Sequence, residues 1–400
     1  MSSGLELGML AYSWDVLDLG VEKTGEIIRT LGCNSLVVNS SYHHARLFEP
    51  QLEKVRDIEK AAVSFHPNWG HYQRLKPLVH KDVADTSILL KAREWCQSNQ
   101  IRFSTWWVGL HNSNLGQANP DLCVKNVWGN TYGYSLCPSQ PDVQDFAKAL
   151  FEDTLTQVEP ERILVESAAF LPFVHGQHHE LAHVEFGDAA QWLLSLCFCN
   201  QCKRNAESEG VDANAVQHLT RGLLHGILQN DMGYARQEAN QISYLLVEFP
   251  ELAQYQQSLI SSVTRLVKQL SDLAHRYKIG FDFVPSSVAF PVNQSFIEGI
   301  SVRKLSKIVD RFVPLAYGGD LPSVQHTLRS VKIVGSAEVG VTFSLNRNLI
   351  KSGDDLEQRA KTAVKNDVTS IYYYNLGLLN QQRMDWIRQA NMQIQQEKGV

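Results

Sequence analysis

Short apolar runs recur along the 400-residue chain and alternate with longer segments of helical periodicity. Eight of these runs are rich in apolar and β-branched residues, which is typical of parallel strands buried on both faces. They cover residues 5–12, 35–39, 101–108, 162–166, 279–284, 312–317, 340–345 and 370–375. The pattern therefore predicts eight strands.

Candidate helices lie between most of these runs, at residues 20–32, 85–99, from about 141, 301–309, 323–331, 355–366 and after 381. Residues 187–277 break the alternation, with candidate helices at 189–196, 214–228 and 251–277. Eight strands that alternate with helices predict an α/β fold, a (β/α)₈ TIM barrel. We expect residues 1–400 to form one barrel, with a loop and helical insertion at 170–277 between strands four and five.

A doubly wound open sheet is the structural alternative. Such a sheet usually has a glycine-rich turn after its first strand, where it binds a dinucleotide. Residues 14–17 read WDVL and contain no glycine. The barrel is therefore favoured.

Aromatic, amide and imidazole side chains gather where the predicted strands end. In (β/α)₈ barrels the chemistry lies at the carboxyl ends of the strands. Flat rings pack against sugar rings, while amides and imidazoles bond to hydroxyls, so this set suits a neutral polyhydroxylated ligand. The candidate substrate-binding residues here are Tyr12, Trp14, His43, His44, Trp106, Trp107, His111, Asn112, Tyr317, Asn346, Tyr373 and Asn375.

The fourth predicted strand ends in Glu166 and leads into a histidine-rich segment. His175, His178 and His179 are further candidates for binding sugar hydroxyls. Residues 179–183 also fit the H-E-x-x-H pattern, in which two histidines hold Zn²⁺ and the glutamate is a general base. The pattern is short and lies in a predicted loop, so a catalytic metal held by His179 and His183 is the alternative.

Cys197, Cys199 and Cys202 form a closely spaced thiol cluster after the histidines. Two thiols at C-x-x-C spacing can hold one Zn²⁺, and Cys197 provides a third ligand. A fourth must come from elsewhere, with Cys137, Cys123 or a histidine as candidates. Neighbouring apolar residues favour a structural zinc, and three packed reduced thiols are the alternative.

The composition is that of an ordinary globular protein, with 44% hydrophobic and 20% charged residues. A net charge of −5 and an isoelectric point near 6.3 give no reason to expect nucleic acid or an anionic membrane as a partner. The N-terminal residues do not resemble a signal peptide, and no apolar run approaches the ~20 residues of a membrane span. These features predict a cytoplasmic protein with reduced thiols, and they do not indicate an oligomeric state.

Four segments carry a resemblance to a known family: SLCPSQPDVQDF, ILVES, CFCNQC and SIYYYNLGLL. Together they make the chain similar to glycosidase-like (β/α)₈ barrels, and most similar to bacterial glycoside hydrolases. The resemblance implies an oligosaccharide or glycoside substrate and Glu166 as the acid/base.

A second carboxylate is less easily assigned. The resemblance places it at the end of strand seven, where this chain has residues 344–346, SLN. Asp282 is the best substitute, with Asp15, Glu180 and Glu185 behind it. The missing carboxylate keeps two alternatives open: a metal-dependent hydrolase or lyase that uses His179, Glu180 and His183, and a catalytically silent sugar-binding barrel.

Overall fold

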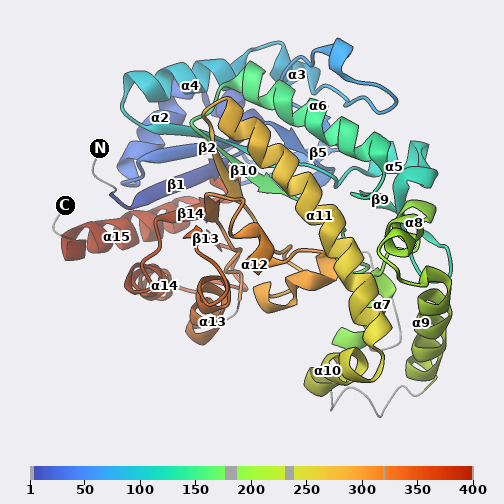
Figure 1. The fold of residues 1–400 in the computed structure, drawn as a ribbon. Coiled ribbons are helices and arrows are strands. Elements are labelled where there is room, and N and C mark those ends of the chain that lie inside the picture. The colour runs from blue at the N-terminus through green and yellow to red at the C-terminus, as the bar shows by residue number, and fades with distance from the viewer. Residues whose placement is uncertain (1–3, 176–186, 230–237, 319, 399–400) are drawn as a thin grey trace.

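The computed structural model describes residues 4–175, 187–229, 238–318 and 320–398 (Figure 1). Eight parallel strands close into a barrel in the order β1-β14-β13-β12-β11-β10-β7-β2. The predicted (β/α)₈ barrel is confirmed. The strands are β1 (Glu6–Ala11), β2 (Ser35–Asn39), β7 (Arg102–Val108), β10 (Arg162–Glu166), β11 (Gly280–Phe283), β12 (Arg311–Phe312), β13 (Glu338–Ser344) and β14 (Ser370–Tyr374).

The sixth barrel strand is shorter than the sequence predicts. Only Arg311 and Phe312 form β12, although Leu315 makes one further bridge to Thr342 of β13. Pro314 lies between them, and a proline has no N–H to give to a sheet. The strand therefore ends before the cavity wall that residues 315–317 build.

Helices surround the barrel close to the predicted positions. The long ones begin where expected, for example at Pro141, because proline suits the first turn of a helix. The helices outside the segment between β10 and β11 are α1 (Ser13–Leu19), α2 (Val21–Thr30), α3 (Lys81–Ala84), α4 (Ile88–Ser98), α5 (Ser113–Ala118), α6 (Pro141–Val158), α12 (Val302–Leu305), α13 (Leu321–Lys332), α14 (Gly353–Lys365) and α15 (Gln381–Lys398).

Two long connections carry small sheets of their own. Residues 40–83 contain the pairs β3 (Ser41–Tyr42) with β6 (Ala62–Val63) and β4 (Ala45–Glu49) with β5 (Lys54–Ile58). The connection after β7 contains β8 (Cys123–Lys125) paired with β9 (Thr131–Leu136). Both connections follow the carboxyl ends of strands, so they help to build the rim of the barrel.

Between β10 and β11 the described residues form α7 (Asp188–Ser195), α8 (Asn200–Ser208), α9 (Ala213–Leu228), α10 (Glu238–Glu248) and α11 (Pro250–Arg276). The sequence pattern did not predict α8 or α10. Helix α11 runs along the barrel beside α6, while α7, α9 and α10 gather at its far end (Figure 1). That residues 170–277 are an insertion remains a prediction.

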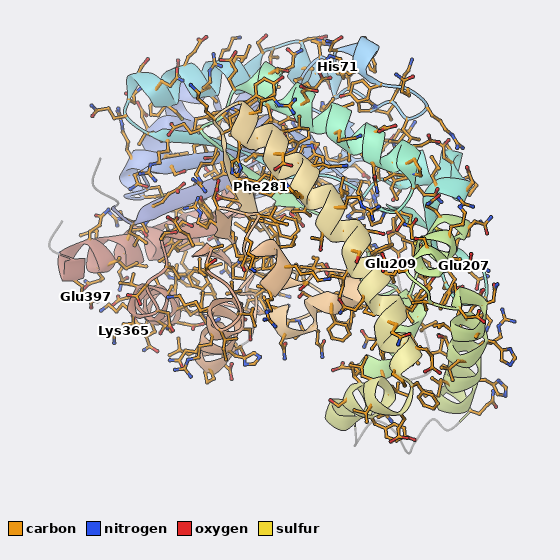
Figure 2. The ribbon with its side chains drawn as sticks, viewed as in Figure 1. His71, Glu207, Glu209, Phe281, Lys365 and Glu397 are labelled. Atoms are coloured by element: carbon orange, nitrogen blue, oxygen red, sulfur yellow. The ribbon has the colours of Figure 1, made fainter. Side chains whose placement is uncertain are left out.

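The core lies between the barrel and its helices. Phe281 of β11 is fully buried there and packs against Phe151 of α6, with 5.9 Å between the ring centroids (Figure 2). Charged residues such as Lys365 and Glu397 lie on the outer helices α14 and α15 (Figure 2). None of the helices in the described part of the chain has the length and apolar character needed to cross a membrane.

Candidate active site

Strand alternation decides which aromatic residues face into the barrel. Successive side chains point to opposite faces of a strand. Trp106 faces inward, whereas Trp107 is fully buried against Phe151 of α6, with ring centroids 5.4 Å apart. The expectation that Trp107 binds substrate is therefore corrected.

The same alternation operates on β14. Tyr374 lines the barrel interior, while the hydroxyl of Tyr373 donates to Oδ1 of Asn391 in α15 at 2.6 Å. Tyr373 thus packs outward and does not reach the cavity, which corrects another predicted binding residue.

A cavity of about 240 Å³ opens at the carboxyl end of the barrel. Its walls combine apolar residues with tyrosine, histidine, serine and one acidic side chain, the mixture expected of a small-molecule site. Five predicted binding residues and the predicted acid lie together in its lining: His43, Trp106, His111, His175, Tyr317 and Glu166. The remaining lining residues are Leu10, Tyr42, Leu164, Ser167, Leu171, Val284, Ser287, Val288, Leu315, Thr342 and Tyr374.

Glu166 ends β10 and projects into this cavity. Its Oε2 accepts a hydrogen bond from Nε1 of Trp106 at 2.7 Å. Burial raises the pKa of Glu166 to about 7, although the bond from Trp106 acts in the opposite direction. The next residue, Ser167, has φ = 58°, a left-handed backbone that a non-glycine residue adopts at some energetic cost. A carboxyl with this pKa is half protonated near neutral pH and can donate a proton there.

Three tyrosine hydroxyls meet beside the cavity. The hydroxyl oxygen of Tyr42 lies 3.0 Å from that of Tyr12 and 3.2 Å from that of Tyr374. The hydroxyls of Tyr12 and Tyr374 are also hydrogen-bonded to each other. Burial, together with nearby tyrosine hydroxyls, raises the pKa of Tyr12 and of Tyr42 well above the usual value. The hydroxyls therefore stay protonated and serve as neutral hydrogen-bonding groups.

Histidines form the adjoining part of the wall, where the ring of His43 stacks on that of Tyr42 with centroids 4.2 Å apart. The rings of His43 and His111 stack with centroids 4.3 Å apart, and His175 lies 5.5 Å from His111 and stacks on Tyr134. Burial lowers the pKa of His43 to about 4 and that of His111 well below its usual value. These two imidazoles are therefore neutral at pH 7. His44 lies behind them, 6.5 Å from His111, and does not line the cavity.

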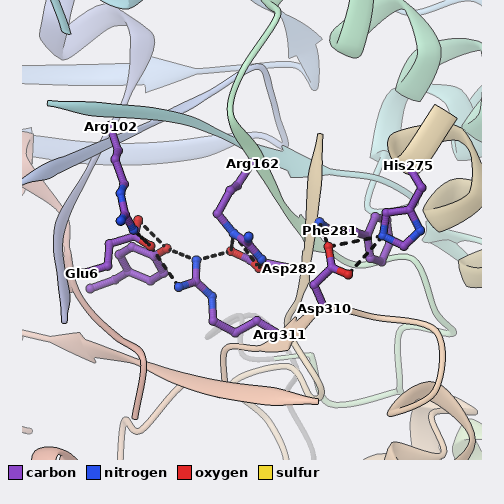
Figure 3. A network of polar contacts seen from close by, with 9 residues as sticks. Glu6, Arg102, Arg162, His275, Phe281, Asp282, Asp310 and Arg311 are labelled. Atoms are coloured by element: carbon purple, nitrogen blue, oxygen red, sulfur yellow. Dashed lines mark hydrogen bonds and ion pairs between the residues drawn. The ribbon is translucent and has the colours of Figure 1, made fainter. Parts of the chain in front are cut away.

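Asp282, predicted as the second catalytic carboxylate, lies instead in a buried ionic network in the barrel (Figure 3). It pairs with Arg162 and Arg311, and Arg311 also binds Glu6 at 2.9 Å. Burial acts to raise the pKa of Asp282, but the charges of the two arginines outweigh it and lower the pKa. Two residues nearer the rim, just after the end of β11, Val284 lines the cavity. Asp282 is therefore a structural residue.

Four other predicted residues do not line the cavity. Asn112 caps α5, Asn346 is exposed in a turn, and Asn375 accepts from the N–H of Gly377. Trp14 is buried and stacks on Tyr12 at 4.6 Å.

Asp15, a further candidate for the second carboxylate, also holds the backbone. Its Oδ2 accepts hydrogen bonds from the N–H groups of Tyr12 and Gly377, and burial raises its pKa to about 8. It therefore joins the end of β1 to the connection that follows β14.

Sequence reasoning placed Tyr42 and Tyr374 at strand ends but did not choose them as binding residues, and it did not select Ser287 or Glu298. Tyr42 lies just past β2 and Tyr374 ends β14, so their position was a usable signal, but Ser287 and Glu298 lie in the connection after β11 and carry no motif. Glu298 is buried beside the site, and its carboxylate accepts hydrogen bonds from the N–H and hydroxyl of Ser287. The predicted residues His178, His179, Glu180, His183 and Glu185 lie outside the described residues.

Four buried cysteines cluster away from the cavity. Cys137 follows β9, and its sulfur lies 3.9, 3.7 and 3.6 Å from those of Cys197, Cys199 and Cys202. The four sulfurs lie within 4.8 Å of one another and are compatible with a metal site. Cys137 is thus the fourth member, while Cys123 bonds to the carbonyl of Gly116.

Comparison with known proteins identifies the fold. The sequence matches no family model and has no significant match among curated proteins. The catalytic domain of β-amylase from Paenibacillus polymyxa superposes with a TM-score of 0.58 at 8% identity, covering 98% of each chain. An exo-β-agarase superposes with a TM-score of 0.51 at 12% identity, covering 96% of this chain and 48% of the agarase. The chain therefore shares the (β/α)₈ barrel fold of these two proteins.

Proposed function

We propose that this protein is a carbohydrate-active enzyme that hydrolyses glycosidic bonds with Glu166 as the proton donor. The observation that carries the proposal is the state of Glu166 at the carboxyl rim: it lines the cavity, accepts a hydrogen bond from Trp106 and has a pKa raised to about 7. Glycoside hydrolysis needs such an acid to protonate the leaving oxygen.

The cavity wall favours a sugar as the ligand. Trp106 and Tyr317 offer ring surfaces, and Tyr42, His43 and His111 offer neutral hydrogen-bonding groups. Nε2 of His111 is buried without a hydrogen-bond partner among the described residues, so a ligand hydroxyl can form a hydrogen bond with it. A phosphorylated or charged ligand gains little from these groups.

A second cavity of about 500 Å³ shares Ser287, Val288, Leu315 and Tyr317 with the first. The two cavities therefore adjoin along one wall. This arrangement favours a substrate of more than one sugar unit, with the bond to be cleaved near Glu166.

The mechanism depends on a second group. Among the described lining residues Glu166 is the sole carboxylate, whereas retaining and inverting enzymes each use two carboxyls. Some glycosidases instead use a group of the substrate as the nucleophile. Activity on glycosides with and without a 2-acetamido group separates a nucleophile supplied by the substrate from one supplied by the protein. The anomeric form of the first product, measured by NMR, distinguishes retention from inversion.

The test is Glu166→Gln measured across a panel of oligosaccharides. We expect turnover to fall by roughly 10²–10⁴-fold, the usual contribution of a general acid, while the fold is kept. Glu161→Gln is the matched control, because Glu161 is an exposed glutamate just before the same strand. Full activity in Glu166→Gln, or sugar binding without turnover by the unmodified protein, contradicts the proposal.

We also propose that the four cysteines hold a structural Zn²⁺. Zn–S bonds of about 2.3 Å in a tetrahedron separate the sulfurs by about 3.8 Å, close to the separations around Cys137. The N–H groups of Lys125 and Cys202 point at the sulfurs of Cys197 and Cys199, which suits thiolates. The ion would join the segment after β9 to α7 and α8.

Elemental analysis of the purified protein tests the metal. We expect about one zinc per chain, lost in Cys199→Ser and kept in Cys96→Ser, a buried cysteine of α4 outside the cluster. The same zinc content in both variants contradicts the site. Because the cluster is separate from the cavity, we expect metal loss to lower the melting temperature more than it lowers turnover below that temperature.

A further inference from the structure

Behind Glu166 lies a third and much smaller cavity of about 10 Å³. Glu166 and Glu298 both border it, together with Ser167, Ser286 and Ser287. Its volume is close to the roughly 10–15 Å³ that one water needs, and its border offers several polar groups. Two glutamates, one at the end of β10 and one in the connection after β11, therefore border one space of about the volume of a water molecule.

The fold holds Glu298 firmly in this place. Glu298 is the last residue of the 3₁₀ helix η3 (Val292–Glu298), and its carbonyl accepts the N–H of Phe170 at 3.1 Å. Gly299 follows with φ = 74°, and a side chain there would collide with Phe170 and Val263. The backbone thus turns tightly and leaves the Glu298 side chain 3% exposed.

In the described part of the chain, no group of opposite charge neutralises the two carboxyls. Among the described residues, no lysine or arginine contributes to the pKa of either group, whereas Asp282 has two arginines. Glu298 is held by neutral donors instead, the N–H of Ser287 at 3.0 Å and its hydroxyl at 2.6 Å. Two like charges in such an environment repel each other strongly, so ionising both is costly.

We infer that Glu298 is a positioning residue for the proposed reaction: its buried carboxyl, fixed by Ser287 behind Glu166, keeps Glu166 in the acid form at neutral pH. The inference rests on the proposed role of Glu166 as proton donor. It gives a function to a carboxyl that does not line the main cavity and so does not touch the substrate there.

The pKa of Glu298 supports this coupling, and because repulsion between two carboxylates is mutual, the same interaction acts on Glu166. Burial raises the pKa of Glu298 to about 7, the charge of Glu166 adds to the rise, and the bonds from Ser287 oppose it. Ser287 therefore favours ionisation of Glu298, and a charged Glu298 disfavours ionisation of Glu166.

Other titratable groups face the site from the neighbouring elements. They are Tyr42 of β3, Tyr374 of β14, Tyr317 after β12, and His43, His111 and His175. The pKa values of the three tyrosines are raised, while those of His43 and His111 are lowered. These five groups are therefore neutral near pH 7, where the carboxyl pair changes charge.

Trp106 provides a readout that needs no substrate. Its indole donates to Glu166, so its fluorescence responds to the ionisation of that carboxyl. Tryptophan emission is followed as pH is varied. The component that reports Glu166 is the one that is lost both in Trp106→Phe and in Glu166→Gln. In Glu298→Gln we expect its midpoint to fall by about one pH unit, because the repulsion is removed.

Activity provides the second readout. In Glu298→Gln we expect kcat/KM to fall about ten-fold at pH 8 and to change little below pH 5. This is the effect of lowering the pKa of Glu166 by about one unit. A merely structural role lowers kcat/KM equally at every pH. An unchanged Trp106 midpoint overturns the inference, even if activity falls.

Ser287→Ala keeps the inference testable if Glu298→Gln does not fold. Without the hydroxyl, Glu298 ionises less readily, so the Trp106 midpoint should fall in the same direction by a smaller amount; an unchanged or higher midpoint overturns the inference. A shifted midpoint in a protein that cleaves no glycoside supports the coupling and rejects the proposed function. Glycoside cleavage with an unshifted midpoint rejects the coupling alone.

Discussion

The indole nitrogen of Trp106 lies 2.7 Å from Oε2 of Glu166, and the two residues come from neighbouring strands of the barrel, β7 and β10. The bond fixes one carboxyl oxygen and leaves the other available to the cavity. It also favours the ionised form, so burial and this bond set the pKa of Glu166 in opposite directions.

Trp106→Phe removes the donor and keeps an aromatic ring. Since the hydrogen bond lowers the pKa of Glu166, its loss should raise that pKa further and move the basic limb of kcat/KM to higher pH. We expect a shift of about half a unit to one unit, together with a lower maximum because the carboxyl is less well oriented. Trp107→Phe is the control, since Trp107 faces α6 and should leave the pH profile in place.

Glu166→Gln should stabilise the protein in alkaline solution. The folded pKa of about 7 exceeds the unfolded value of about 4.3, so the stabilising effect of the bound proton is lost as pH rises through 7. Glutamine has no such dependence. The free energy of unfolding of the variant, relative to that of the unmodified protein, should therefore increase by about 1–3 kcal/mol as the pH is raised from 4 to 8. Urea titrations across this range measure the gain, and a constant difference contradicts the assigned pKa.

Asp282→Asn should destabilise the fold without direct damage to the cavity. It leaves Arg311 and Arg162 with one partner charge fewer in a buried network, a change that costs about 3–5 kcal/mol. Thermal and urea unfolding measure the loss, and turnover well below the melting temperature should be nearly unchanged. Asp57→Asn, which breaks an exposed pair with Arg46, should cost at most about 1 kcal/mol.

The Asp282 network should also weaken in acid. The folded pKa of Asp282 is lowered, so its contribution is present above the unfolded value of about 3.9 and is lost as pH falls through the folded value. The difference in stability between the unmodified protein and Asp282→Asn should therefore shrink below pH 4. A difference that stays constant down to pH 2 would show that the carboxylate is not paired.

His111→Phe should weaken substrate binding more than catalysis. It keeps the stacking on His43 but removes Nε2, which is buried without a partner among the described residues. We expect KM to rise roughly ten- to a hundred-fold with a smaller change in kcat, the usual loss for a buried hydrogen bond to a ligand. An unchanged KM contradicts a sugar contact at this residue. Asn346→Ala, in an exposed turn, is the control.

The sequence alone determined the eight strands, most of the helices and the position of Glu166 at the end of strand four. These features are local: apolar runs and helical periodicity are read within a few residues of the chain. The spacing of Cys197, Cys199 and Cys202 likewise identified the cysteine cluster. Its fourth member, Cys137, lies sixty residues away from Cys197, and the sequence left it as one of several choices.

Tertiary structure decided which face of each strand points inward. Barrel strands are buried on both faces, so Trp106 and Trp107, or Tyr373 and Tyr374, look alike in sequence although only one of each pair reaches the cavity. The tertiary structure also decided how deep a strand residue lies in the barrel. Asp282 is buried and paired with arginines from two neighbouring strands, and it does not reach the rim. Glu298 and Glu166 border the same small space, and no short-range pattern encodes this, because proximity between distant segments arises only when the barrel closes.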